Sequence, residues 1–333
     1  MISSKKPNLA FIHRIFSLAH TYKAKRTTQF KDKILINAFF EPSTRTSLSF
    51  ESAMYRLGGN VINFNKELSS IKKGESFEDT IRTLSTYGDA IVLRHPEKGM
   101  VEKASKISSV PIINGGDGDG EHPTQGLLDL FTIYKSFNLH DKLNILFVGD
   151  IMHSRTVNSL LDYLSIYPFS KINILPYYNR EPNYDLLYEI AKDHTQIVED
   201  IVVSEDTLEL DKYDVIYVTR LQKERSSEHD KVTHIVDKNF LSKTKKSCII
   251  MHPLPRNEEI DPEIDNDPRC KYFEQMENGI AIRMAVLHHT LIDIVNERKT
   301  EEHTRIRDEY MKMIENETEI RRQNMINGTL GAL

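Results

Sequence analysis

Cysteine is almost missing from this chain, since Cys248 and Cys270 are the only two among 333 residues. Two thiols are too few for a disulfide scaffold or a zinc cluster, which excludes the protein classes that depend on either. The apolar runs are far too short to cross a bilayer. Residues 1–30 carry lysines and a loose helical pattern but no uninterrupted signal core. We therefore expect a cytoplasmic protein.

An excess of positive charge is also absent. The net charge is −5 at pH 7, and no basic stripe interrupts the sequence, so nothing favours a nucleic-acid partner. Hydrophobic residues make up 39% of the chain, which at this length is enough for two medium-sized domains.

Short apolar runs alternate with helical patterns along most of the chain. The expected strands are 34–39, 61–64, 90–93, 111–113, 145–148, 172–175, 215–218 and 248–251, and the expected helices include 75–86, 125–134, 155–164 and 184–192. This alternation is typical of an α/β fold with doubly wound parallel sheets. The polar stretch 138–142 divides the pattern, so we predict two domains, residues 1–138 and 139–284, with a cleft between them.

The last part of the chain has a different character. From residue 296 onward it is rich in charge, and Ile306, Tyr310 and Met313 recur at helical spacing. An amphipathic helix and a solvated tail both fit this pattern, and we expect the final residues to be disordered. We treat residues 301–333 as a charged C-terminal extension.

The most informative segment is residues 39–47. An apolar run that predicts a buried strand ends at Pro42, and Ser43 and Thr44 stand where an N-cap would open a helix. The unpaired backbone N–H groups and the positive dipole end of that helix favour an anion. Together with Arg45 and Thr46 they predict a phosphate cradle without P-loop glycines. The alternative is a Ser/Thr-rich cap beside a surface arginine.

Polar residues follow four other predicted strands and open one further helix. They are Arg94, the His122–Gln125 helix start, Asp150 with Arg155, Arg220 with Gln222, and the segment from His252 to Arg256. Each arginine alone could make a surface ion pair. However, the carboxyl ends of parallel strands meet at one edge of a sheet, where α/β proteins bind ligands.

Two interpretations stay open for His122 and for the loop with Lys72 and Lys73, whereas the glycine run allows one. The run Gly115–Gly120 lacks dinucleotide-binding spacing, and its aspartates would repel a pyrophosphate, so we expect a flexible loop. His122 could be an ordinary capping or buried histidine, or a donor to a carbonyl oxygen. The loop with Lys72 and Lys73 could be simply solvated, or it could close over an anionic ligand.

Taken together, these segments resemble the catalytic chain of aspartate carbamoyltransferase over about residues 5–295. The matching segments, in the family's order, are 40–47, Ser69 with 73–76, 89–96, 121–125, 128–132, 149–150 with 155–157, 219–225, 252–256, 277–279 and 283–285. Met152 and Ser154 depart from the commonest pattern, which affects the details of that loop.

The resemblance implies a role for each matching residue. Ser43, Thr44, Arg45, Thr46 and Arg94 would hold the phosphate of carbamoyl phosphate. Arg45, Thr46 and His122 would point at the carbamoyl oxygen, and Gln125 with the backbone carbonyls of Pro253 and Leu254 would bind the carbamoyl NH2. Arg155, Arg220 and Gln222 would bind the two carboxylates of L-aspartate. Ser69 and Lys73 would reach the donor and aspartate from a neighbouring subunit.

The resemblance also implies the wider organisation. The first domain would bind carbamoyl phosphate and the second L-aspartate, residues 285–300 would form a C-terminal helix that returns to the first domain, and the active sites would be shared within a homotrimer. The reaction, an early step of de novo pyrimidine biosynthesis, would need no cofactor and no metal. No segment resembles the zinc-bearing regulatory chain.

Two other functions compete with this one. Ornithine carbamoyltransferase shares the phosphate turn and the His-Pro-x-Gln segment, but its typical His-Cys-Leu-Pro and Ser-Met-Gly signatures are absent here, where His252 precedes Pro253. A catalytically silent scaffolding homologue would be favoured by the loss of key residues. Arg45, Lys73, His122, Arg155 and Arg220 are all present.

Overall fold

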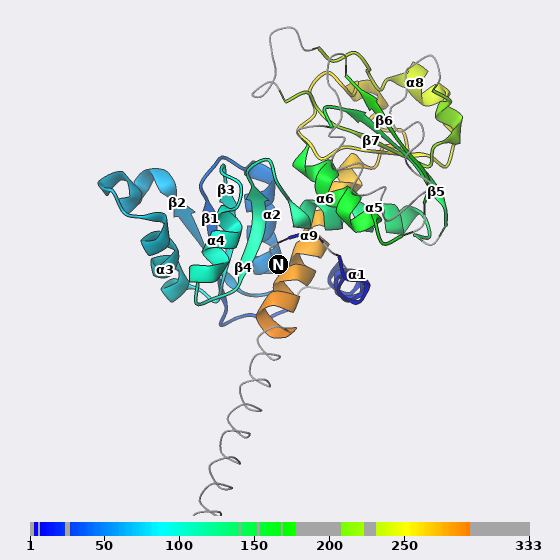
Figure 1. Cartoon of the computed structure of the whole chain (residues 1–333). Helices are drawn as coiled ribbons and strands as arrows, with labels where there is room; N and C mark the ends of the chain where they lie inside the picture. Colours follow the sequence, from blue (N-terminus) through cyan, green and yellow to red (C-terminus); the bar gives the residue numbers. More distant parts are fainter. Residues whose placement is uncertain are drawn as a thin grey trace, which may run out of the picture. The chain divides into compact units, whose positions relative to one another are not determined.

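The chain folds around two parallel β-sheets (Figure 1), each with four strands in the part of the chain that the structure describes. This computed structural model describes residues 3–5, 7–23, 27–139, 141–151, 154–167, 169–177, 208–222 and 231–293. By its internal contacts the chain divides into two compact units, residues 1–287 and 288–333. Both sheets belong to the first unit.

The first sheet has the order β2-β1-β3-β4 and the second the order β6-β5-β7-β8. Their strands are β1 (Ile34–Phe39), β2 (Asn60–Asn65), β3 (Ala90–His95), β4 (Ile112–Asp117), β5 (Leu143–Gly149), β6 (Phe169–Pro176), β7 (Val215–Val218) and β8 (Ile249–Met251). All neighbouring strands pair in parallel. In both sheets the chain order reverses once, which is the doubly wound pattern that the sequence predicts.

Helices connect and flank these strands. They are α1 (Leu9–Lys23), α2 (Thr44–Arg56), α3 (Phe77–Tyr87), α4 (Met100–Ile107), α5 (Pro123–Ser136), α6 (Arg155–Leu164), α8 (Lys238–Ser242) and α9 (Tyr272–His288). Short 3-10 turns cover Lys66–Leu68, Ser70–Lys73, Leu210–Lys212 and Pro262–Ile264, and a π-helical turn covers His289–Asp293. None of the described helices is both long and apolar enough to span a membrane.

Burial of the apolar runs explains why the sheets form. Ile36 and Leu93 on the first sheet pack with Ile81 of α3 and Val101 of α4 in one core cluster. A second cluster surrounds β7 and β8 and reaches Tyr272 at the start of α9. Strands β1, β3, β5 and β7 are almost wholly buried, as their continuous apolar sequences predict. The edge strand β2 is largely exposed.

The sequence pattern located the elements well and misjudged one of them. Strands 34–39 and 215–218 and helix 155–164 have the predicted bounds, and most others differ by a few residues at their ends. The expected flexible loop at Gly115–Gly120 is wrong in its first half, because β4 continues through Gly115 and Gly116 to Asp117. Glycine has a low strand propensity, which concealed this extension. The expected helix 184–192 and the extension 301–333 lie outside the described residues.

Helices α5 and α6 approach each other at Gly126. A methyl group on Gly126 would come within 2.7 Å of the backbone carbonyl carbon and oxygen of Ser159. No side chain can therefore be inserted at this contact without displacing a backbone. The contact joins the helix that follows β4 to the helix that follows β5.

Gly149 at the end of β5 provides a test of the fold. Its φ is +118°, and a methyl group there would collide with the carbonyl oxygen of Thr219 and approach its Oγ1 to 2.7 Å. We expect Gly149→Ala to lower the free energy of unfolding by about 3 kcal/mol or more, from left-handed strain and overpacking together. Urea denaturation measures this loss.

The matched control is Gly99→Ala. Gly99 also has a positive φ, +88°, but a methyl group there meets nothing within 4 Å. Only the backbone strain remains, about 1–2 kcal/mol. Equal losses for the two variants would contradict the proposed collision at Gly149.

Candidate active site

The polar residues at the strand ends meet around one cavity of about 760 Å³. Its lining contains every residue to which the family resemblance assigns a role except Ser69 and Lys73. These lining residues are Ser43, Thr44, Arg45, Thr46, Arg94, His122, Gln125, Arg155, Arg220, Gln222, Pro253 and Leu254. Residues that lie far apart in the sequence therefore form one site, as the topology predicts.

One wall of the cavity is the N-terminus of α2. Ser43 occupies the N-cap position with an extended backbone, but its side chain makes no capping hydrogen bond. The hydroxyl and the first N–H groups of the helix thus remain available to an anion. Arg45 lies in this first turn, where burial and, secondarily, repulsion from Arg220 lower the pKa of its guanidinium.

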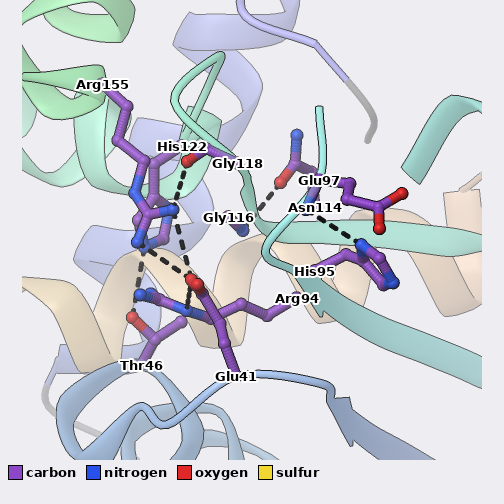
Figure 2. Close-up of polar contacts among 10 residues, drawn as sticks. All are labelled: Glu41, Thr46, Arg94, His95, Glu97, Asn114, Gly116, Gly118, His122 and Arg155. Carbon is purple, nitrogen blue, oxygen red and sulfur yellow. Dashed lines mark hydrogen bonds and ion pairs between the residues drawn. The ribbon is translucent and has the colours of Figure 1, made fainter. Parts of the chain in front are cut away.

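Glu41 joins two of the arginines in the cavity. Its Oε1 accepts a hydrogen bond from Arg94 Nε at 2.6 Å and from Arg155 NH1 and NH2 at 3.3 and 3.2 Å. Arg155 NH1 also donates to the carbonyl oxygen of Gly118, as Figure 2 shows. Burial and repulsion from Arg155 lower the pKa of Arg94 to about 10, while Glu41 opposes the shift. The Arg94 guanidinium therefore stays charged at neutral pH.

His122 lies at the N-cap of α5, yet its side chain does not cap the helix. It is 4% exposed, and its Nε2 is 3.1 Å from Thr46 Oγ1, a contact that Figure 2 draws. Burial, then repulsion from Arg155, Arg94 and Arg283, lowers the pKa of His122 well below its usual value. The imidazole is therefore neutral at pH 7.

Gln125 and the segment after β8 line another part of the cavity. Gln125 lies in the first turn of α5, and its Nε2 donates to Asp129 Oδ1 at 2.9 Å. Pro253 and Leu254 follow His252, and Leu254 adopts a left-handed φ of +51° before a cis peptide bond to Pro255. His252 Nδ1 accepts the N–H of Leu254 at 2.8 Å, which holds this bend.

Arg220 and Gln222 follow β7. Arg220 NH1 donates to the carbonyl oxygen of Leu221 at 3.3 Å, and the N–H of Gln222 donates to Asp150 Oδ2 at 3.2 Å. Asp150 is wholly buried after β5, so it ties the ends of two neighbouring strands together. The predicted residue pairs at these strand ends are thus adjacent in space.

Ser69 and Lys73 do not line the cavity of their own chain. Ser69 Oγ donates to the carbonyl oxygen of Lys66 at 2.8 Å and accepts the N–H of Ile71 at 3.4 Å, so it organises the turn after β2. Lys73 is exposed at the end of that turn. Both residues belong to the polar loop between β2 and α3.

The lining suits an anionic ligand. Arg283 joins the four predicted arginines in the cavity wall, and burial lowers its pKa to about 10. Such a site stabilises phosphate and carboxylate groups through charged hydrogen bonds. Within the described ranges, no three or more His, Cys, Asp or Glu side chains are arranged to hold a metal ion.

Sequence reasoning assigned no role to Glu41, Asp129, Gln275 or Arg283. For two of them, the neighbouring sequence could have indicated a place in the site. Glu41 immediately precedes the predicted phosphate turn, and Asp129 is four residues after Gln125 on one helix, the spacing of a Gln–Asp pair. Gln275 carries no such signal, since its partner Asp129 is 146 residues away.

Two family models cover nearly all of the chain up to residue 290. Residues 1–135 match the aspartate/ornithine carbamoyltransferase, carbamoyl-P binding domain, and residues 141–290 match the aspartate/ornithine carbamoyltransferase, Asp/Orn binding domain.

Curated relatives share more than 40% of the aligned residues. The aspartate carbamoyltransferase catalytic subunit of Thermococcus onnurineus is 45% identical over 267 residues, which are 78% of this chain and 85% of that protein. The multifunctional protein pyr1-3 of Dictyostelium discoideum is 44% identical over 303 residues, 86% of this chain. The chain spans only 13% of the length of that protein.

A solved structure shares the fold. Aspartate transcarbamoylase from Trypanosoma cruzi, in complex with carbamoyl aspartate and phosphate, matches with a TM-score of 0.79 and 38% identity. The match covers 87% of this chain and 95% of that one.

The arginine pair at Glu41 yields a prediction about anions. We expect Glu41→Gln to bind inorganic phosphate about 3- to 10-fold more tightly, because two guanidiniums lose the carboxylate that offsets their charge. Isothermal titration calorimetry at low salt measures the affinity. Glu102→Gln, which removes an exposed carboxylate paired with Lys106, is the control and should change nothing. Weaker phosphate binding in Glu41→Gln would show that Glu41 mainly orients the arginines.

Proposed function

This chain belongs to the aspartate/ornithine carbamoyltransferase family, and from that premise we propose that it transfers the carbamoyl group of carbamoyl phosphate to the amine of L-aspartate. The products are N-carbamoyl-L-aspartate and phosphate, in an early step of pyrimidine biosynthesis. The observation that carries the proposal is the cavity itself. It combines a helix N-terminus suited to a phosphate with two further arginines, Arg155 and Arg220, suited to a dicarboxylate.

The donor would bind at α2. Ser43, Thr44, Arg45, Thr46 and Arg94 would hold its phosphate, supported by the uncapped helix N-terminus. Its carbonyl oxygen would face Arg45, Thr46 and His122, and the contact between Thr46 and His122 supports a common target for the last two. The carbamoyl NH2 would meet Gln125 and the backbone carbonyls of Pro253 and Leu254.

The acceptor would bind between the strand ends of the second sheet. Arg155, Arg220 and Gln222 would bind the carboxylates of aspartate, which leaves the amine directed at the carbamoyl carbon. We propose that residues 1–138 supply most of the donor site and residues 139–284 the acceptor site. The same proposal places the protein in the cytoplasm.

The chemistry follows from these residue types. The amine attacks the carbonyl carbon, and the oxygen gains negative charge that Arg45, Thr46 and His122 stabilise. The C–O bond to phosphate then breaks, and the departing phosphate, held by arginines, accepts the amine proton. Fixing both substrates side by side removes much of the entropic barrier. No step requires a cofactor or a metal ion.

Lys73 and Ser69 would complete the site from a neighbouring chain of a homotrimer. The support is that neither residue lines the cavity of its own chain, although both belong to a matching segment. A lysine ammonium would neutralise the charge of both substrates.

Ornithine is the competing acceptor within the family. Its side-chain amine would attack the carbamoyl carbon and its α-ammonium group would need a carboxylate partner, but Glu41 is the acidic residue among those described in the cavity lining, and it is hydrogen-bonded to two arginines. An assay that offers carbamoyl phosphate with either L-aspartate or L-ornithine tests the proposal directly. We expect product from aspartate alone, with a chelator present. Product from ornithine, or none from either, would contradict the proposed function.

Substitutions of Arg94 and Arg220 should weaken the binding of different substrates. We expect Arg220→Ala to weaken apparent aspartate affinity about 10- to 100-fold, the loss of a charged bidentate contact. Carbamoyl phosphate alone should bind as before. Arg94→Ala should instead weaken carbamoyl phosphate. Equilibrium titration of both variants with carbamoyl phosphate checks this, and a loss in Arg220→Ala rather than Arg94→Ala would invert the assignment.

Mixing two inactive variants tests the shared site. We expect Lys73→Ala and Arg45→Ala to be nearly inactive alone, because each removes a charge that contacts the substrates. After mild dissociation and mixing, mixed trimers should regain activity, since some sites then contain both residues. The control mixes Lys73→Ala with Ser69→Ala. Both substitutions lie in the same loop, so every chain in this mixture carries an altered loop and no site can receive an intact one. Equal activity in the two mixtures would exclude a shared site.

A further inference from the structure

Asp129 is a wholly buried carboxyl group behind the cavity that the proposed chemistry does not use. It does not line the cavity, but both of its oxygens are hydrogen-bonded. Oδ1 accepts from Gln125 Nε2 at 2.9 Å and from Gln275 Nε2 at 2.6 Å, and Oδ2 accepts from Tyr217 Oη at 2.7 Å. These donors come from α5, α9 and β7, so three elements converge on one carboxyl group. Burying a carboxyl group is costly unless its partners compensate.

The first consequence concerns the orientation of Gln125. A carboxylate only accepts hydrogen bonds, so the amide of Gln125 must present its NH2 to Asp129. Its carbonyl oxygen is therefore left for the cavity that Gln125 lines. Without such a partner, an amide side chain can present either its oxygen or its nitrogen. Asp129 thus determines that Gln125 offers the ligand an acceptor.

The second consequence concerns the segment after β8. Gln275 also presents its NH2 to Asp129, so its Oε1 is free to accept the N–H of His252 at 3.0 Å. His252 Nδ1 accepts the N–H of Leu254 and hence carries no proton, so Nε2 donates to Glu259 Oε1 at 2.9 Å. One carboxylate is thereby connected to both parts of the cavity wall that face the proposed carbamoyl NH2.

We propose that Asp129 is a positioning residue that makes the cavity selective for a donor with an NH2 group next to its carbonyl. It acts directly through Gln125 and, through Gln275, on the segment from His252 to Leu254. The inference rests on the proposed function, because it concerns the donor of that reaction. It adds the group that discriminates a carbamoyl phosphate from an acyl phosphate of the same shape.

Protonation of Asp129 leaves this orientation intact. Burial raises its pKa to about 7, while hydrogen bonds from Tyr217, Gln275 and Gln125 and the charge of Arg283 oppose the shift. Above this pH the carboxylate accepts from both amides. Below it, a proton on Oδ2 can point to Tyr217 Oη, and Oδ1 still accepts from both amides. The orientation of Gln125 therefore holds in both protonation states.

Three phosphates distinguish positioning from general damage. Carbamoyl phosphate carries the NH2, acetyl phosphate replaces it by a methyl group, and inorganic phosphate has neither. Calorimetric titration of the full-length protein with each gives three affinities. We expect Asp129→Leu, which removes both acceptor oxygens, to weaken carbamoyl phosphate about 10-fold and to leave the other two within about twofold, because only the first contacts Gln125 through a hydrogen bond.

Tyr217→Phe is the matched control. It removes the donor to Oδ2 but leaves both amides bonded to Oδ1, so the ratio of carbamoyl to acetyl phosphate affinity should be retained. In a Gln125→Ala background, Asp129→Leu should weaken carbamoyl phosphate binding clearly less than in the wild type. An equal cost in that background, or a similar loss for all three phosphates, would overturn the proposal.

A measurement on the unaltered protein guards against misfolding of the variant. The wild type should bind carbamoyl phosphate about 10-fold more tightly than acetyl phosphate, because only the carbamoyl NH2 can donate a hydrogen bond to Gln125. Equal affinities for these two donors would contradict the proposed selectivity. If the wild type prefers neither donor over inorganic phosphate, the proposed function itself fails.

Discussion

Electrostatic repulsion among arginines is the constraint on which the site depends. Arg45, Arg94, Arg155, Arg220 and Arg283 all line one cavity. Burial and mutual repulsion lower the pKa of several of them, and burial together with the same charges lowers the pKa of His122 and keeps it neutral. Glu41 and Asp129 offset part of this charge. The arrangement stores an unfavourable energy that an anionic ligand relieves, so the site is built for its ligands rather than for stability.

The neutral state of His122 fits the same logic. A charged imidazolium in this position would add a further cation to the group, at a cost that grows with burial. A neutral ring, in contrast, can donate one hydrogen bond to a carbonyl oxygen while the arginines supply the charge. In the proposed function, the neighbouring arginines would supply the charge and His122 the direction of a hydrogen bond.

Much of this arrangement could be predicted from the sequence, because it follows from local rules. Apolar runs such as 34–39 and 215–218 can only be buried strands here, and parallel strands bring their following residues to one edge. The strand through Gly115 and Gly116 could not be predicted, since glycine supplies no side chain to reveal it. The pairing of Gln275 with Asp129 depends on how α9 packs against α5, which no local pattern encodes.

The close approach of α5 and α6 at Gly126 has a mechanical consequence. Because a side chain at position 126 would meet the backbone of Ser159 at 2.7 Å, the two helices can approach this closely only with a glycine there. Gln125 precedes that glycine by one residue, and Arg155 opens the other helix. The spacing of the main chain at these two residues therefore depends on a contact of backbone with backbone. A glycine that does not itself line the cavity thus helps to place two side chains that do.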